Sequence, residues 1–269
     1  MPEQVSRRAA LTGLLLLAFA SAGAPIPALP PGLRNLWRDG TVVSRGRRSV
    51  VVGHHTGAAT LGELARRADT AGTRVSDVLG EPVTPLVVVP ASTAEAARLA
   101  GVGRLDGLAA VADGGRVIVV PEFFAALNSV GKDVVLAHEL THVAAGTGGL
   151  PVWLYEGFAD YVGYRDAGLP VRTAAAELAA EVRAGRLPSA LPGPAAFAAD
   201  GRDPARLARA YQEAWLACRF LADRFGEGTL VRLYRDARAA GVDQALAAQG
   251  LSVDSLTARW RAYVRDQLG

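Results

Sequence analysis

Cysteine and methionine are almost absent from this chain of 269 residues, which contains one of each. A single cysteine, Cys218, excludes a disulfide within the chain, so stability must come from the core and from any bound ligand. Cys218 lies in an apolar run with helical character, which favours a buried packing role for its thiol. No cysteine occurs in residues 1–24, which argues against lipid attachment in that segment.

Strong net charge is also missing, because 29 basic and 26 acidic side chains leave a formal charge of +3 at pH 7. The arginines are spread over many predicted helices without aromatic residues between them, so nucleic-acid binding is not expected. Half of the residues are hydrophobic and a fifth are charged, which is typical of a globular protein. A chain of this length can bury one core, arranged as one domain or two subdomains.

Histidine is scarce as well, and two of the four histidines share the motif His138-Glu139-Leu140-Thr141-His142. A helix advances about 100° per residue, so His138 and His142 project from nearly the same face and can bind one divalent metal. Glu139 lies one step round the helix, where it can take a proton from a water molecule on that metal. The motif therefore predicts a zinc site suited to hydrolysis.

A third ligand is expected from the helix that follows. The motif helix should begin near Lys132 and end in the glycine-rich stretch 146–149, and Pro151 suits the first turn of the next helix. Two helices joined by so short a turn must pack side by side, which brings Glu156 back towards the two histidines. Asp160, four residues later, shares the face of Glu156 and can accept a hydrogen bond from a ligand histidine.

These residues resemble a known family. The motif and the segment Trp153-Leu154-Tyr155-Glu156-Gly157-Phe158-Ala159-Asp160-Tyr161 are similar to those of the gluzincin metallopeptidases, most closely their short peptidase-MA-like branch. The resemblance runs from about Val50 to the C-terminus and is weak before Val117. It implies that His138, His142 and Glu156 bind zinc and that Glu139 is the general base.

The same resemblance suggests a donor for the oxyanion that forms during hydrolysis. The segment 210–215, Ala-Tyr-Gln-Glu-Ala-Trp, is similar to a later helix of the family whose tyrosine has this role. Tyr211 is therefore the candidate donor, with an ordinary core position as the alternative. Tyr155 and Tyr161 are weaker candidates.

The metzincin alternative does not fit the residues. It would require a glycine at position 145, a histidine at position 148 and a downstream methionine turn, whereas the chain has Ala145, Gly148 and only Met1. The remaining histidines, His54 and His55, lie far upstream. Neighbouring residues of a regular strand point to opposite faces, so this pair is not expected to serve one metal. An ordinary surface role is favoured over a pH-sensitive contact or a substrate contact.

Residues 1–24 are expected to be an export signal. Arg7 and Arg8 precede the apolar run 9–20 and a group of small residues, and Ser6-Arg7-Arg8 with Leu11 is similar to a twin-arginine signal. An uncleaved membrane anchor is the alternative, but the prolines and glycine of the stretch 9–32 argue against a stable spanning helix. The protein is expected to be secreted or associated with the cell envelope, with the membrane contacted only through this segment.

The order of the predicted elements indicates an α+β fold. Residues 25–48 are expected to be a spacer, residues 49–130 a small sheet with helices, and residues 131–269 a mainly helical lobe with a zincin-like active-site helix. Strands are predicted at 49–53, 85–89 and 116–120, and helices at 61–78, 94–100, 205–224, 228–239 and 253–267. The resemblance offers Val117–Val120 as an edge strand that binds an extended peptide, with an ordinary core strand as the alternative.

The sequence thus predicts an exported zinc metallopeptidase that acts on a peptide or protein. Two other functions stay open: a zinc-binding cell-envelope interaction module that cleaves nothing, and an amidase of the cell wall that uses the same site. The presence of Glu139 argues against the first of these, because metal binding alone requires only the ligands.

Overall fold

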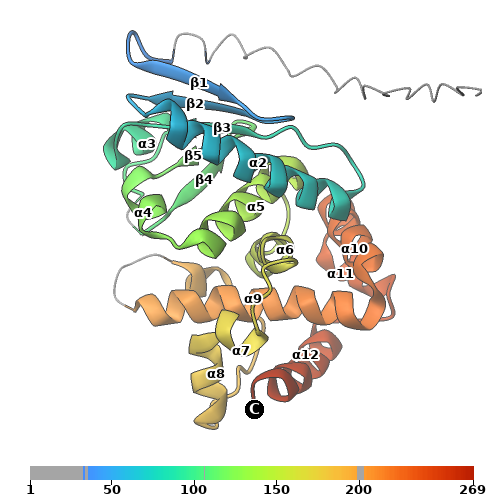
Figure 1. The fold of residues 1–269 in the computed structure, drawn as a ribbon. Helices are drawn as coiled ribbons and strands as arrows, with labels where there is room; N and C mark the ends of the chain where they lie inside the picture. The colour runs from blue at the N-terminus through green and yellow to red at the C-terminus, as the bar shows by residue number, and fades with distance from the viewer. Residues whose placement is uncertain (1–32, 34–35, 106, 199–202) are drawn as a thin grey trace, which may run out of the picture.

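A computed structural model describes residues 33, 36–105, 107–198 and 203–269 of the chain. The predicted export signal, residues 1–24, lies outside these ranges. A small N-terminal sheet is followed by a mainly helical region, which confirms the α+β prediction (Figure 1). No helix within the described ranges is both long and apolar enough to cross a membrane.

The described elements alternate between strand and helix at first and are helical from residue 121 onward. The strands are β1 (Thr41–Arg45), β2 (Val50–His54), β3 (Leu86–Val89), β4 (Ala110–Asp113) and β5 (Arg116–Val119). The helices are α2 (Ala58–Leu79), α3 (Thr93–Leu99), α4 (Pro121–Ala126), α5 (Ser129–Ala145), α6 (Val152–Tyr164), α7 (Val171–Ala174), α8 (Ala176–Arg183), the 3₁₀ helix η1 (Pro194–Phe197), α9 (Pro204–Phe225), α10 (Glu227–Ala240), α11 (Val242–Ala247) and α12 (Val253–Leu268).

The five strands form one sheet in the order β1-β2-β3-β5-β4. Strands β2, β3 and β5 are parallel, while β1 and β4 pair antiparallel to their neighbours. Because β5 is hydrogen-bonded to both β3 and β4, the expectation that Val117–Val120 is an edge strand is wrong. The outer strand on that side of the described sheet is β4, which joins β5 through Gly114 and Gly115 with φ of 53° and 80°, as a two-residue hairpin turn requires.

The spacer predicted for residues 25–48 is also partly wrong, because β1 lies within it. The turn after β1 is held by Asp69 of α2, whose carboxylate accepts hydrogen bonds from the backbone N–H groups of Arg47, Arg48 and Ser49 at 2.6, 3.0 and 2.9 Å. Burial alone would raise the pKa of Asp69, but these hydrogen bonds hold it below its usual value. The turn thus depends on a residue about twenty positions away.

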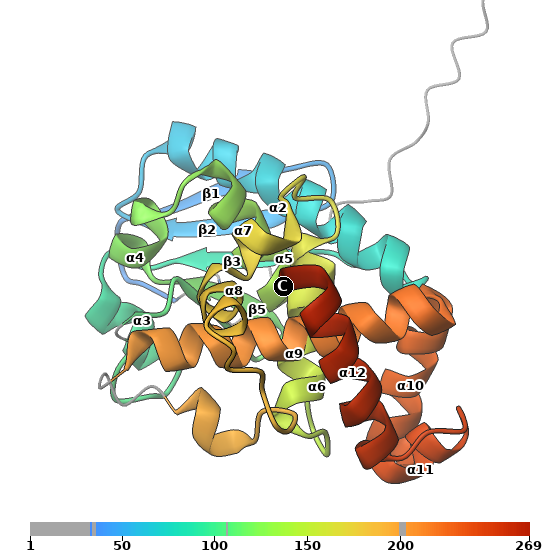
Figure 2. The ribbon, with the colours of Figure 1, turned by 90° about the horizontal axis from the view of Figure 1, so that it is seen from below.

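Alternate residues of the strands pack into two cores, as the period of a strand dictates. Val87, Val117 and Val119 belong to a large core shared with α2, α5 and the helical region, whereas Val88 and Ile118 pack with α3 on the other face. The large core continues without a break from β2 to α12. Figure 2 shows the same arrangement from below.

Helix α6 lies between α5 and α9, and Figure 1 shows α9 running across the molecule beside it. Two glycines permit this close approach. A Cβ atom on Gly157 would lie 2.2 Å from the carbonyl oxygen of Ala214 in α9, and one on Gly163 would lie 3.0 Å from the carbonyl oxygen of Val134 in α5. Cys218 of α9 is fully buried at the same contact, which confirms its predicted packing role.

Replacing Gly157 by alanine is expected to destabilise the protein by about 1–3 kcal/mol or more, because the new methyl group collides with rigid backbone. Gly62 provides a matched control within α2, where a Cβ atom would meet nothing closer than 3.9 Å. Gly62→Ala should leave stability unchanged or raise it by up to about 1 kcal/mol, since alanine favours a helix. Equal urea midpoints for the two variants would contradict this account of the α6–α9 contact.

Candidate active site

Helix α5 carries the histidine motif, and its ends are set by local signals. The side chain of Asn128 accepts a hydrogen bond from the backbone N–H of Gly131 at 2.8 Å, so the helix begins at Ser129, three residues earlier than expected. It ends at Ala145, and Gly146 with φ of 67° reverses the chain. Helix α6 then starts at Val152 with Pro151 at its N-cap, one residue before the first turn in which Pro151 was expected.

The structure brings His138, His142 and Glu156 together from these two helices. The Nε2 atoms of His138 and His142 are 3.0 Å apart, and Oε2 of Glu156 lies 3.2 Å from the first and 3.4 Å from the second. One atom of each side chain thus occupies the corner of a small triangle. No other described group of three or more potential ligands includes any of these residues.

This triangle fits a tetrahedral metal ion. Ligands placed tetrahedrally at about 2.0–2.1 Å from zinc stand about 3.3–3.4 Å apart, so the separations found here agree to within a few tenths of an ångström. Oε2 of Glu156 is buried, and no hydrogen bond of good geometry satisfies it among the described residues. A buried oxygen facing two imidazole nitrogens is the environment that a cation would complete.

Asp160 fixes the orientation of His138. Nδ1 of His138 lies 2.8 Å from the Asp160 carboxylate, which accepts a hydrogen bond from it, and this orients Nε2 towards Glu156 and His142. Asp160 is 8% exposed, so the pair is largely shielded from water. The expected hydrogen bond between Asp160 and a ligand histidine is therefore present.

The carboxylates favour positive charge where the imidazoles meet. Burial alone would lower the pKa of His138, but the charges of Asp160 and Glu156 outweigh it and hold that pKa well above its usual value. Burial alone would raise the pKa of Glu156, but the two neighbouring imidazoles lower it to about 2. Glu156 is consequently an anion at neutral pH, which is the form that binds a metal.

Glu139 lies beside this cluster on α5. Its carboxylate interacts with the charges of His138, His142 and Glu156, and it accepts a hydrogen bond from the backbone N–H of Ala112 in β4. Burial raises the pKa of Glu139 above its usual value, while the histidines and this hydrogen bond act in the opposite direction. The outer side of β4 therefore adjoins the cluster.

Two tyrosines flank the cluster on either side. The ring centroid of Tyr211, from α9, lies 6.3 Å from that of His138, and the ring of Tyr155, from α6, lies 5.9 Å from that of His142. Burial and the nearby carboxylates raise the pKa of both hydroxyl groups, so both keep their protons at neutral pH. Tyr161, the third candidate, instead donates to Glu227 at 2.8 Å.

Comparison with models of known protein families gives no match to this chain, and comparison with curated protein sequences gives none either.

Sequence reasoning missed the contribution of β4. The signal was present, since Asp113-Gly114-Gly115-Arg116 is a strong hairpin sequence directly before the predicted strand 116–120. The contact between Ala112 and Glu139 could not be predicted from local sequence patterns, because these residues are far apart in the chain.

Asp160→Ala is expected to weaken the tightest zinc affinity of the protein by about 10- to 100-fold, because His138 would lose its orienting partner. Asp160→Asn should cost less, since its amide oxygen can still accept from Nδ1. Asp166→Ala, just after α6 and 57% exposed, is the matched control and should bind zinc as the wild type does. Competition with a chromophoric chelator measures all four dissociation constants. A value for Asp160→Ala within about threefold of wild type would remove its orienting role.

Proposed function

We propose that this protein is a zinc-dependent metallopeptidase. The observation that carries the proposal is the triangle formed by Nε2 of His138, Nε2 of His142 and Oε2 of Glu156, with sides of 3.0, 3.2 and 3.4 Å. Two imidazoles and one carboxylate are a common ligand set for catalytic zinc, which keeps a position for water. The side chains are 12–15% exposed, which is consistent with access of a small molecule to the cluster.

The proposed reaction is hydrolysis of a peptide bond. Zinc, when bound, would polarise the carbonyl and lower the pKa of a coordinated water molecule towards about 7. Glu139 takes a proton from the attacking water, whose oxygen adds to the carbonyl carbon. Glu139 then gives this proton to the nitrogen of the leaving amine as the carbon–nitrogen bond breaks, so that atoms and charge balance.

Two further parts of the chain support this chemistry. The hydroxyl group of Tyr211 or Tyr155 is available to donate to the oxyanion, and Tyr211 remains our candidate. An extended substrate can pair with the outer side of β4, because that strand ends the described sheet and Ala112 directs its N–H towards Glu139. Export and contact with a peptide or protein substrate remain part of the proposal.

Glu139→Gln is the test that separates catalysis from metal binding. The amide cannot accept the proton, so the variant should bind zinc like wild type and lose about 10²- to 10⁴-fold in the rate of peptide hydrolysis. Cleavage of a broad peptide library, with zinc content measured on the same samples, gives both quantities. Glu81→Gln, whose side chain is 73% exposed, is the matched control and should cleave at the wild-type rate.

Other outcomes identify the alternatives. Zinc-replete wild type that cleaves no peptide but releases products from peptidoglycan fragments would indicate a cell-wall amidase. Zinc-replete wild type without activity on either substrate would indicate a binding module. Undiminished hydrolysis by zinc-replete Glu139→Gln would remove Glu139 from the role of base.

A further inference from the structure

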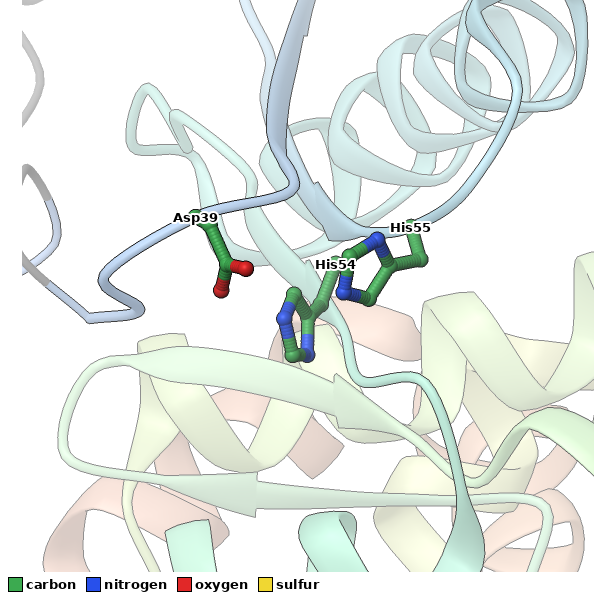
Figure 3. A group of neighbouring side chains, drawn as sticks. All are labelled: Asp39, His54 and His55. Atoms are coloured by element: carbon green, nitrogen blue, oxygen red, sulfur yellow. The ribbon is translucent and has the colours of Figure 1, made fainter.

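A second group of potential metal ligands lies at the other end of the sheet. Asp39, His54 and His55 each offer one ligand atom, and these three atoms lie within 4.8 Å of one another. Asp39 precedes β1, whereas His54 ends β2 and His55 follows it. Figure 3 shows the three side chains converging at the open end of the β1–β2 pair. None of these residues contributes to the His138 cluster.

The expectation that His54 and His55 point to opposite faces is wrong. β2 ends at His54, and His55 has left the strand with φ of 52°, an unusual value for a residue other than glycine. This turn brings the two rings to a centroid separation of 4.2 Å. The backbone N–H of His55 donates to the carbonyl of Gly40 at 2.8 Å, which fixes the turn next to the segment that carries Asp39.

His54 is held in the form that binds a metal. Its ring stacks on Trp37 at 4.6 Å with an interplanar angle of 8°, and Nδ1 lies 2.9 Å from the Glu95 carboxylate. Glu95 also accepts a hydrogen bond from the backbone N–H of Ala91 at 2.6 Å. Because an ionised carboxylate can only accept hydrogen bonds, Nδ1 of His54 is the donor in its contact with Glu95. The proton of the neutral ring therefore resides on Nδ1, and Nε2 carries the lone pair.

No residue that the structure describes uses that Nε2 atom. It is buried and has no hydrogen-bond partner among the described residues. Burying a polar atom without a hydrogen-bond partner lowers the stability of a protein, unless a bound ligand supplies the missing contact. The same arrangement occurs at His138, where a carboxylate also holds Nδ1 and Nε2 faces the other ligands.

We propose that Asp39, His54 and His55 form a second site for a divalent transition-metal ion such as Zn²⁺. Two imidazoles and one carboxylate suit metals of this class, and the Glu95–His54 pair supplies the outer hydrogen bond that such sites use. The proposal is independent of the peptidase function, because it shares no residue with the His138 cluster.

The two sites should differ in affinity. Asp39 and His55 are exposed, whereas the three side chains of the His138 cluster are only 12–15% exposed, so ordering the second set of ligands around an ion costs more side-chain freedom. Because His54 is held on two sides, the exposed side chains of Asp39 and His55 are the ones that would adjust around the ion. Metal binding would thereby tie the segment before β1 to the end of β2, at the rim of a pocket of about 360 Å³ that His54 and His55 help to line. The second site should bind zinc more weakly than the first.

Zinc stoichiometry tests the proposal without any measurement of activity. Equilibrium dialysis of the full chain against Zn²⁺ should give two ions for wild type and one for His55→Asn, because asparagine tolerates a positive φ but removes the imidazole. Asp39→Asn should weaken the second binding step by more than about tenfold. Asp77→Asn removes the same charge from another exposed position and should bind like wild type.

A His138→Ala/His142→Ala background isolates the second site and should retain one ion, which His55→Asn then abolishes. If that background does not fold, the difference in zinc uptake between wild type and His55→Asn still tests the second site. Should the His138 cluster bind no zinc, wild type would take up one ion and His55→Asn none, so failure of the two proposals is distinguishable. Identical zinc uptake by wild type, Asp39→Asn and His55→Asn would overturn the second site.

Discussion

The close packing of α6 between α5 and α9 is the constraint on which the candidate active site depends. Its ligand atoms come from two helices, so the triangle of His138, His142 and Glu156 keeps its size only while those helices keep their distance. Gly163 lets α6 approach the backbone of α5, and Gly157, next to Glu156, lets it approach α9. Larger side chains at these positions would move Glu156 by more than the few tenths of an ångström that a zinc site tolerates.

Charge is the second requirement of this arrangement. Two histidines and two carboxylates are held at low exposure, and removing such groups from water is unfavourable unless each finds a compensating partner. Asp160 is hydrogen-bonded to Nδ1 of His138, while the carboxylate of Glu156 faces both imidazoles. A cation at the centre would satisfy the three atoms that face one another, Nε2 of both histidines and Oε2 of Glu156. The chain uses the pairing of a carboxylate with Nδ1 a second time at Glu95 and His54.

Local sequence signals predicted much of this site, and the remainder depends on contacts between distant residues. The spacing of His138 and His142, the glycines after Ala145 and Pro151 before α6 are local, and the contact between α5 and α6 follows from them. Strand β1 was missed because its side chains alternate between exposed and half-buried positions and its following turn is held by Asp69. Strand β4 was missed because it is short and only Ala110 in it is buried. The convergence of His54 and His55 depends on one backbone angle, which periodicity cannot reveal.

Central to the proposed function is a single zinc ion held by α5 and α6 between His138, His142 and Glu156. Diffraction from crystals grown with zinc, recorded on both sides of the zinc absorption edge, tests this directly. An anomalous peak about 2.0–2.2 Å from Nε2 of both histidines and from a carboxylate oxygen of Glu156 is the predicted result. Fully occupied zinc elsewhere, with no peak between these three side chains, would contradict it.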